Sequence, residues 1–520
     1  MANSVALDVG SSVMIAVLVA GFCRNRGWST AIPLLMVGLV IGLLPFGPHG
    51  LADPESVLIV ILAPLVFGEG LTSSILDLRR VRRPVVALAV GLVVFGAVAV
   101  GFVAQWVMPG IWTSMAFALG AILGPTDAVA VSATARRAGL PRRLVTILEG
   151  ESLVNDGTAL TLLRVCSVAA AAGSITAWQG VGILATSVLG GLAVGAVAGL
   201  GLLALVRRAR DTTVTNGTVL LAPLPVYFVA EAVHGSGILA VVVAALILAH
   251  GSLSTIDFAS GRMQAAGLWM TVTFVLQSAA FFLVGLEMPV VIERMPLAHI
   301  RILPIAVPVV FLTLVVARFI FVYLMAAFSG AGVRRPGWLV IAWAGARGPV
   351  SALAAFTLPV STDSGQVIPF RDLVISTTFG VVVLSLLLAP TVVWLAKAMD
   401  LPHDDDRATK RRVRAALARA SLERLDQIEE SRDEAGDPLP EEAVSRLRET
   451  AERRLELASK VADQVSTDPQ RLARDVRAVR MEMMHAEQEA LLGIRTSEGL
   501  PDDIVRELQG EIDARIHAAR

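Results

Sequence analysis

Charged residues are scarce in this chain. Only 17% of its 520 residues are Asp, Glu, Lys or Arg, whereas 55% are hydrophobic, and the mean hydropathy is +0.69. Soluble domains carry about 25% charged residues, so this composition excludes an ordinary soluble protein and predicts many membrane crossings. The formal net charge is +0. We therefore expect the chain to contact membrane lipid and not nucleic acid.

Cysteine and lysine are also rare. The two cysteines, Cys23 and Cys166, are far apart in sequence, which argues against a disulfide framework or a cysteine metal site. Lysine occurs only at Lys397, Lys410 and Lys460, so every basic residue before Lys397 other than histidine is arginine.

The apolar runs end near Ala396, and a polar region follows. We therefore expect a transmembrane domain over residues 1–398 and a cytosolic helical tail over 399–520. Within the tail, Ala, Leu, Arg and Glu recur at helical spacing, which predicts helices over 411–430, 441–465 and 471–492. The tail has no glycine loop for a nucleotide and no cluster of metal ligands, so we expect no cofactor.

About 20 apolar residues are needed for each membrane-spanning helix. On this basis the sequence predicts an all-α polytopic membrane protein with about thirteen transmembrane helices. The expected ranges are 5–22, 30–46, 54–72, 85–108, 112–134, 144–171, 179–206, 218–233, 236–250, 268–287, 302–327, 337–359 and 373–396.

Arginine asymmetry predicts the orientation of these spans. With the N-terminus outside, the outer loops hold only Arg294, Arg301 and Arg371. The inner loops hold many more: Arg24, Arg26, Arg79, Arg80, Arg82, Arg83, Arg136, Arg137, Arg142, Arg143, Arg207, Arg208, Arg210, Arg262, Arg334 and Arg335. We therefore expect an outside N-terminus, a cytoplasmic tail and a location in the plasma (inner) membrane.

Two spans contain residues that interrupt helices. The fifth contains Gly124-Pro125-Thr126-Asp127, and the twelfth contains Gly345-Ala346-Arg347-Gly348-Pro349. Proline removes a backbone donor and glycine costs about 1 kcal/mol in a helix, so both spans should unwind there. Because the two spans are seven apart, they enter from opposite sides, as in inverted repeats whose broken helices meet at the midplane of secondary transporters.

Carboxylates lie within the sixth span, where Glu149, Glu151 and Asp156 interrupt an apolar stretch. Each ionisable group in hydrocarbon costs roughly 2.5–3.5 kcal/mol, so such groups face protein or water and mark an ion pathway. Ser152 and Asp156 are one helical turn apart, as are Glu151 and Asn155, so four polar groups share one side of one helix. The alternative is a polar seam that joins helices, which suits Ser and Asn better than carboxylates.

Other charges within the spans have simpler explanations. Arg318 lies deep in the eleventh span and needs a carboxylate partner, for which we choose Glu151. Glu69, Arg164 and Glu287 lie nearer span ends, where we expect their side chains to snorkel to the interface, and we expect Glu231 to be interfacial or structural.

These motifs resemble those of the monovalent cation:proton antiporters of the NhaP and NHE type. Residues 124–131 are similar to the unwound-helix motif of that family, with Ala128 where many members have Pro, and residues 149–156 are similar to its Glu-Gly-Glu-Ser-Leu-x-Asn-Asp signature. Ala317-Arg318 and residues 345–348 match its two late arginine motifs, and residues 64–69 match its third-span pattern more loosely. The resemblance covers about residues 5–396.

The resemblance implies a core domain of spans 4–6 and 11–13 that moves against a dimerisation domain of spans 1–3 and 7–10 in a homodimer. Asp156 would carry either the cation or the proton, and Ser152, the Thr126 carbonyl and, through water, Asp127 would complete the cation site. Glu151 would pair with Arg318, supported by Asn155, and Arg347 would offset the carbonyl dipoles of the broken helices.

The implied function is exchange of a monovalent cation, first of all Na⁺ and alternatively K⁺ or Li⁺, for H⁺, with a role in pH homeostasis. Members with Asn before the aspartate exchange one cation for one proton, so Asn155 predicts electroneutral exchange. Carboxylate, hydroxyl and carbonyl oxygens are the ligands that a hard cation prefers, so the chemistry is consistent with the residues alone.

Two other functions fit the residues less well. An intramembrane aspartyl protease could use Asp127 and Asp156 as a dyad, but neither lies in a Gly-x-Gly-Asp sequence. A passive cation channel would need a filter, and no repeated carbonyl filter motif is present. We therefore expect a transporter and not an enzyme.

Overall fold

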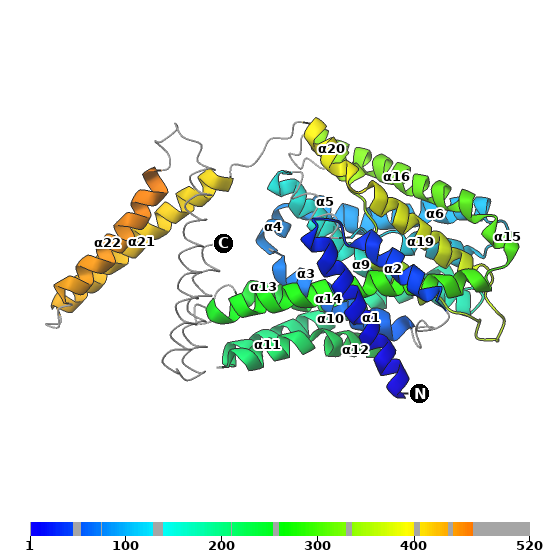
Figure 1. Ribbon diagram of the computed structural model, residues 1–520, viewed down its shortest axis with the longest axis horizontal. Coiled ribbons are helices and arrows are strands. Elements are labelled where there is room, and N and C mark those ends of the chain that lie inside the picture. The colour runs from blue at the N-terminus through cyan, green and yellow to red at the C-terminus, as the bar shows by residue number, and fades with distance from the viewer. Residues whose placement is uncertain are drawn as a thin grey trace, which may run out of the picture. The chain divides into compact units, whose positions relative to one another are not determined.

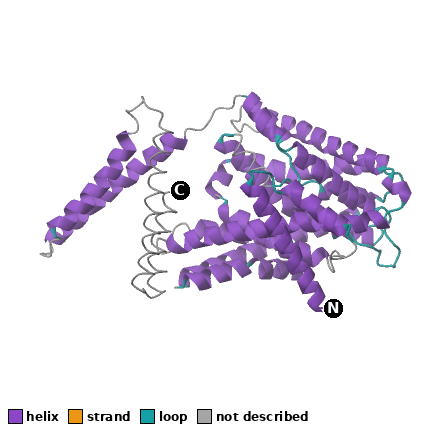
Figure 2. Cartoon of the chain, viewed as in Figure 1, coloured by secondary structure: helices purple, strands orange, loops and turns teal. Residues whose placement is uncertain are grey.

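The computed structural model describes residues 2–44, 54–73, 75–127, 139–209, 211–252, 259–328, 335–399, 406–434 and 440–460. These residues are mostly helical and include no β-strand (Figures 1 and 2), although Ser361 and Val367 form an isolated bridge. The predicted all-α fold is confirmed. Close contacts divide the chain into two compact units, Met1–Asp404 and Asp405–Arg520.

The helices of the first unit overlap the predicted spans, except for two short helices that lie between spans, Ile75–Arg80 and Leu297–Ile300. Their bounds are α1 Ala2–Asn25, α2 Ala31–Gly42, α3 Pro54–Thr72, α4 Ile75–Arg80, α5 Arg82–Val86, η1 Ala87–Leu92, α6 Val93–Val107, α7 Thr113–Ile122, α9 Arg142–Ala171, α10 Ala177–Arg208, α11 Thr212–Leu221, α12 Pro223–Ala232, α13 Gly237–Ser252, α14 Ala259–Arg294, α15 Leu297–Ile300, α16 Leu303–Phe328, α17 Arg335–Trp343, α18 Pro349–Phe356, α19 Arg371–Leu388 and α20 Thr391–Ala398.

Seven helical segments within the described residues are long and apolar enough to cross a membrane by themselves. They are Arg82–Val107, Arg142–Ala171, Ala177–Arg208, Thr212–Ala232, Gly267–Arg294, Leu303–Ala327 and Arg371–Leu388. Shorter apolar helices occupy several other predicted spans, for example Ala31–Gly42 and Gly237–Gly251. The chain is therefore a multi-pass membrane protein, and the number thirteen stays a prediction.

Four spans differ in detail from the prediction. The eighth begins at Thr212 and is interrupted at Pro223, and the thirteenth is not continuous, because α19 ends at Leu388 and α20 begins after Pro390. Proline lacks the backbone N–H that would continue each helix. The tenth span is longer at both ends than 268–287, and the fourth contains the π-helix η1, which no pattern in the sequence predicts.

Both predicted breaks leave residues outside helices. Helix α7 ends at Ile122 and residues 125–127 lie outside any helix, while the following stretch, 128–138, lies outside the described residues. In the twelfth span, α17 ends at Trp343 and α18 begins at Pro349, so residues 344–348 form an unwound segment. Residues 125–127 are called the 125–127 segment, and residues 344–348 are called the 344–348 segment.

Helices of the first unit pack in two groups. Helices α1–α3 and α10–α14 contact mainly one another, most extensively α2 with α14 and α10 with α13. Helices α6, α7, α9 and α16–α19, with η1, form the other group, through the pairs α6–α7, α7–α9, α6–α16 and α16–α19. Figure 1 shows α10, α12 and α13 together, and α6, α16 and α19 on another side of the unit. We call these groups the scaffold group and the core group.

The second unit contains two described helices, α21 Asp406–Glu434 and α22 Glu441–Lys460, which pack against each other. Arg448 of α22 pairs with Asp426 and Glu429 of α21, at 2.8 Å to each carboxylate. Helix α21 covers the first predicted tail helix, and α22 covers the second, 441–465, as far as Lys460. Residues 461–465 and the third predicted helix, 471–492, lie outside the described residues. Before them, Lys397 is exposed in the last turn of α20.

Candidate ion-binding site

Helix α9 carries four buried polar side chains within two turns. Glu151, Ser152, Asn155 and Asp156 are between 0% and 7% exposed. Their spacing places Ser152 directly one turn before Asp156 and Glu151 one turn before Asn155. Since α9 runs unbroken through this region, it presents these groups at fixed positions.

The two unwound segments meet next to this part of α9. The N–H of Asp127 donates a hydrogen bond to the carbonyl of Ala346 at 2.9 Å, which joins the 125–127 segment to the 344–348 segment. A Cβ added at Gly348 would lie 2.8 Å from the carboxyl carbon of Asp127, so glycine is needed for this approach. The predicted meeting of the two breaks is therefore present in the structure.

Thr126 is the residue through which the 125–127 segment contacts α9. The Ser152 hydroxyl donates to the Thr126 carbonyl, and the Asn155 amide donates to the Thr126 hydroxyl at 3.0 Å. The Thr126 hydroxyl in turn donates to Oε1 of Glu151 at 3.5 Å, which is a long hydrogen bond. Asn155 thus reaches Glu151 through Thr126 and does not contact it directly.

Glu151 and Arg318 form a buried ion pair, the pairing that the sequence analysis chose. Both nitrogens of the Arg318 fork donate to the two carboxylate oxygens, with 2.8 Å between Nη2 and Oε2. The side chains are only 3% and 2% exposed. Arg318 also donates to the carbonyls of Ile341 and Ala344 at 3.1 and 3.2 Å, so it ties α9 and α16 to the end of α17.

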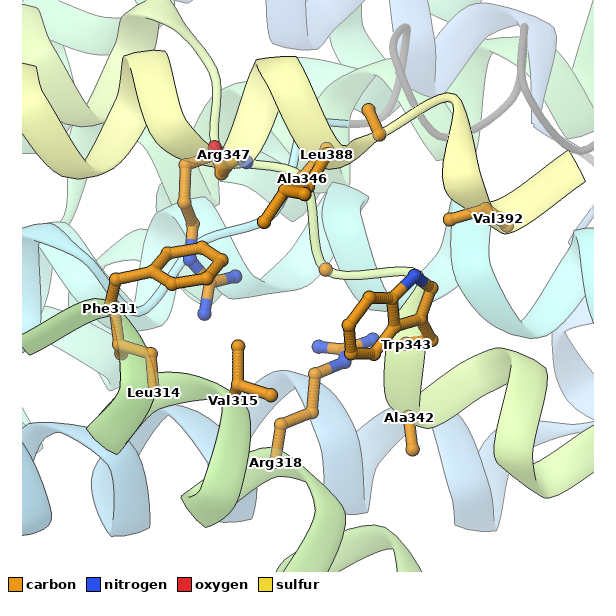
Figure 3. A pocket seen from close by; sticks show the side chains of 13 residues that line it. Phe311, Leu314, Val315, Arg318, Ala342, Trp343, Ala346, Arg347, Leu388 and Val392 are labelled. Atoms are coloured by element: carbon orange, nitrogen blue, oxygen red, sulfur yellow. Dashed lines mark hydrogen bonds between the residues drawn. The ribbon is translucent and has the colours of Figure 1, made fainter. Parts of the chain in front are cut away.

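Arg347 is the second buried arginine of the core group. Its guanidinium donates to the Pro125 carbonyl at 3.2 Å, and its backbone N–H donates to Ser385 at 3.0 Å. Arg347 and Arg318 line one small cavity of about 40 Å³ together with Phe311 and Trp343 (Figure 3). The Arg347 guanidinium therefore lies against a carbonyl of the 125–127 segment, and its role in offsetting carbonyl dipoles stays a prediction.

Asp156 is the carboxylate without a fixed partner. Within the described part of the chain, neither of its oxygens accepts a hydrogen bond, although Ser152 is one turn away on the same helix. Its charge is close enough to those of Asp127 and Glu69 for the three to repel one another. Such an arrangement favours a positive ion or a proton between them.

The candidate cation ligands are oxygen atoms of different chemical groups. Among the described residues, no three His, Cys, Asp or Glu side chains gather closely enough to hold a metal ion by themselves. A cation here would be held by the Asp156 carboxylate, the Ser152 hydroxyl and the Thr126 carbonyl, with Asp127 farther along the same segment. These are hard ligands, which suit an alkali cation.

The expectation of snorkelling was wrong for three charged residues. Glu69 of α3 is half-buried and lies within electrostatic range of Asp156, Asp127 and Glu149, so its side chain belongs to the site region rather than to the interface. Glu287 is buried, at 8% exposure. Arg164 pairs with Glu231 at 3.0 Å instead of snorkelling. Snorkelling was inferred from distance to the span end, which does not reveal which helices lie alongside.

The chain is similar to known sodium/hydrogen exchangers along most of its length. The model of the sodium/hydrogen exchanger transmembrane family matches residues 12–395. An uncharacterized Na⁺/H⁺ exchanger of Mycobacterium tuberculosis is 32% identical, over 96% of this chain and 94% of its own length. A sodium, potassium, lithium and rubidium/H⁺ antiporter of Bacillus subtilis is 26% identical, over 96% of this chain and 76% of its own.

The fold is that of a solved member. The sodium proton antiporter MjNhaP1 of Methanocaldococcus jannaschii superimposes with a TM-score of 0.64 at 20% sequence identity, covering 77% of this chain and 99% of that one. The family model spans nearly the whole membrane unit and includes both breaks and the polar part of α9. The chain belongs to the sodium/hydrogen exchanger family.

Proposed function

We propose that this protein exchanges a monovalent cation for H⁺ across the plasma membrane, with Na⁺ as the first candidate and K⁺ or Li⁺ as alternatives. One observation carries the proposal: Asp156 is buried without a hydrogen-bond partner in the described residues, one helical turn from a serine and beside an unwound backbone segment. The names of the relatives, which include Na⁺/H⁺ exchangers and a sodium, potassium, lithium and rubidium/H⁺ antiporter, support it.

Competition at Asp156 is the proposed mechanism. The ionised carboxylate, the free lone pairs of Ser152 and the Thr126 carbonyl would hold the cation, and Asp127 would contact it through water. Protonation of Asp156 would remove the charge that holds the cation, so each ion displaces the other. Glu69, which approaches from α3, is a further oxygen that could face the cation.

Movement of the core group against the scaffold group would carry the site from one side to the other. The Glu151–Arg318 pair and the contact between Asp127 and Ala346 join the parts of the core group, which supports its movement as one body. In this proposal residues 1–398 form the transport domain, the scaffold group forms the dimer contact, the N-terminus lies outside and the tail is cytoplasmic. The resulting exchange would serve pH homeostasis.

We further propose one cation for one proton. Asn155 is neutral and Glu151 is neutralised by Arg318, so Asp156 alone would carry the transported charge. Membrane potential should then leave exchange unaffected, whereas each elementary charge that moved would contribute about 2.3 kcal/mol per 100 mV. The test is the exchange rate in proteoliposomes whose membrane potential is clamped with valinomycin. Exchange that follows the imposed voltage would show a second moving charge, and Asp127 would be the first residue to change.

Asp156→Asn tests the main proposal. Amide for carboxylate keeps the size and removes the titrating group, so we expect loss of cation-induced dequenching of a pH dye in everted vesicles. Asp211→Asn is the matched control. Asp211 caps α11 by accepting from Val214 and Thr213, which holds its pKa below the usual value, and Asn caps helices equally well.

The Asp211 variant should therefore exchange like the unchanged protein. Dequenching at the normal level in well-inserted Asp156→Asn would contradict the assignment of Asp156. Cation flux that continues without any proton movement would instead indicate a passive channel.

A further inference from the structure

A polar cavity lies between the core group and the scaffold group, beyond Asp156 along α9. Its volume is about 410 Å³, and its core-group wall includes Thr161, Arg164 and Ser167 of α9. The scaffold-group wall includes Glu231 of α12 and Ser236 just before α13. By the arginine asymmetry, α9 begins inside at Arg142, so this cavity faces the outer half of the membrane.

The cavity begins one helical turn beyond Asp156. Leu160 lines the cavity and follows Asp156 by four residues, which corresponds to about 6 Å along a helix axis. Leu160, Ile59 and Ile238 contribute apolar side chains to the cavity wall, and the latter two are 9% and 2% exposed. Asp156 itself does not line this cavity.

Among the described residues, one ion pair joins α9 to the scaffold group at this cavity. Arg164 donates to Glu231 at 3.0 Å and, more weakly, to the Gly235 carbonyl at 3.4 Å. The other oxygen of Glu231 accepts from the N–H of Gly237 at 3.1 Å, at the start of α13. Arg164 therefore contacts both the end of α12 and the turn before α13.

Apart from this pair, α9 packs more closely within the core group than against the scaffold group. Helix α9 contacts α7 and η1 extensively, and α10, α13 and α3 much less. Both side chains of the pair remain about one-third exposed, at 32% and 33%, so water reaches them and the pair can open without leaving a dry, isolated charge.

We infer that the Arg164–Glu231 pair is a latch that holds the transporter in the conformation in which Asp156 is closed to the outer cavity. The inference rests on the proposed function, because exchange requires α9 to move relative to the scaffold group. The latch must open for Asp156 to reach the outer side. Loss of either charge then raises the fraction of molecules that are open to that side.

Thiol labelling measures the opening directly. In a Cys23→Ala/Cys166→Ala background, Thr161→Cys places a thiol at a cavity position that is only 5% exposed. A membrane-impermeant methanethiosulfonate added from outside should react slowly with it. Adding Glu231→Gln, which removes the charge but retains an acceptor for Gly237, should raise the labelling rate at least about fivefold, or about 1 kcal/mol in the opening equilibrium.

Three further variants complete the test. Arg164→Gln should have an effect similar to that of Glu231→Gln, and the double variant should label no faster than either, because both remove one interaction. Ser167→Cys, at a more exposed position of the same cavity, should label from outside at the same rate with and without the latch.

An unchanged Thr161→Cys rate in both latch variants would overturn the latch, and labelling of Ser167→Cys only from the inside would overturn its outer location. Labelling requires no transport. The latch can therefore fail while Asp156→Asn still abolishes exchange, and the proposed function can fail while the labelling rates still change.

Discussion

At the scale of single residues, the buried charges of the core group differ in how many partners each has. Arg318 donates to a carboxylate and to two backbone carbonyls, whereas Glu151 has Arg318 and one long bond from Thr126. Asp156, five residues after Glu151 on the same helix, has no such partner in the described chain. A structural role therefore suits Glu151 and Arg318, and a titrating role suits Asp156.

Removal of one member of the ion pair should destabilise the protein. Loss of either partner of a buried pair costs about 3–5 kcal/mol, because the other charge is left without compensation. Arg318→Ala should lower the thermal unfolding temperature in detergent more than Glu151→Ala does, since Arg318→Ala also leaves two carbonyls unbonded. The double variant should regain part of the loss. Simple addition of the two single effects would show that the residues are not coupled.

The sequence revealed most of the site residues because carboxylates are costly in an apolar span. That argument located Glu151 and Asp156, and the need of Arg318 for a partner led to Glu151. It could not locate Glu69 or the Arg164–Glu231 pair, because these depend on which helices lie side by side. Span number and hydropathy contain no information on those neighbours.

At the scale of helices, close packing in the scaffold group depends on small residues. Every fourth residue of α10 from Gly191 to Gly199 is a buried glycine facing α13. A Cβ added at Gly195 would lie 2.6 Å from the Ala240 carbonyl oxygen and 2.8 Å from the Cβ of Val243. The two backbones therefore approach as closely as in other small-residue membrane interfaces.

Gly195→Ala should destabilise the protein by about 1–3 kcal/mol, the usual cost of overpacking. Gly201→Ala on the same helix is the control, because its added Cβ would meet nothing within 4 Å. Alanine is a better helix former, so that variant should be neutral or stabilising by up to about 1 kcal/mol. Thermal unfolding in detergent measures the stability of both variants. Equal effects at both positions would show that α10 and α13 do not pack this closely.

Most helices could be predicted from apolar runs, and the two functional breaks from their Gly-Pro sequences. The interruptions at Pro223 and Pro390 were missed because flanking residues stay apolar, so hydropathy does not change where the backbone turns. The π-helix η1 was missed for another reason. It lies against α9 and α16, and such tertiary contacts leave no periodic pattern in the local sequence.

At the scale of the whole molecule, the chain separates into a membrane unit and a tail unit. Every candidate ligand of the cation and the Glu151–Arg318 pair lies in Met1–Asp404. The described tail helices are held by their own ion pairs, such as that of Arg448 with Asp426.

Deletion of residues 405–520 should therefore leave insertion and exchange intact. The measurement is dye dequenching in everted vesicles, at matched amounts of inserted protein and over a range of pH, because a tail can alter the pH profile without supplying ligands. A truncated protein that is well folded but does not exchange would place an essential element in the tail.

The distribution of lysine has a practical consequence for topology. Lys397, exposed at the end of α20, is the first lysine of the chain. A protease that cleaves only after lysine therefore has no cleavage site in the residues before it, and digestion leaves the membrane part as one intact fragment. With a cytoplasmic tail, such a protease shortens the protein in inside-out vesicles and leaves it whole in right-side-out vesicles. A single gel band thus reports which face of the membrane the chain ends on.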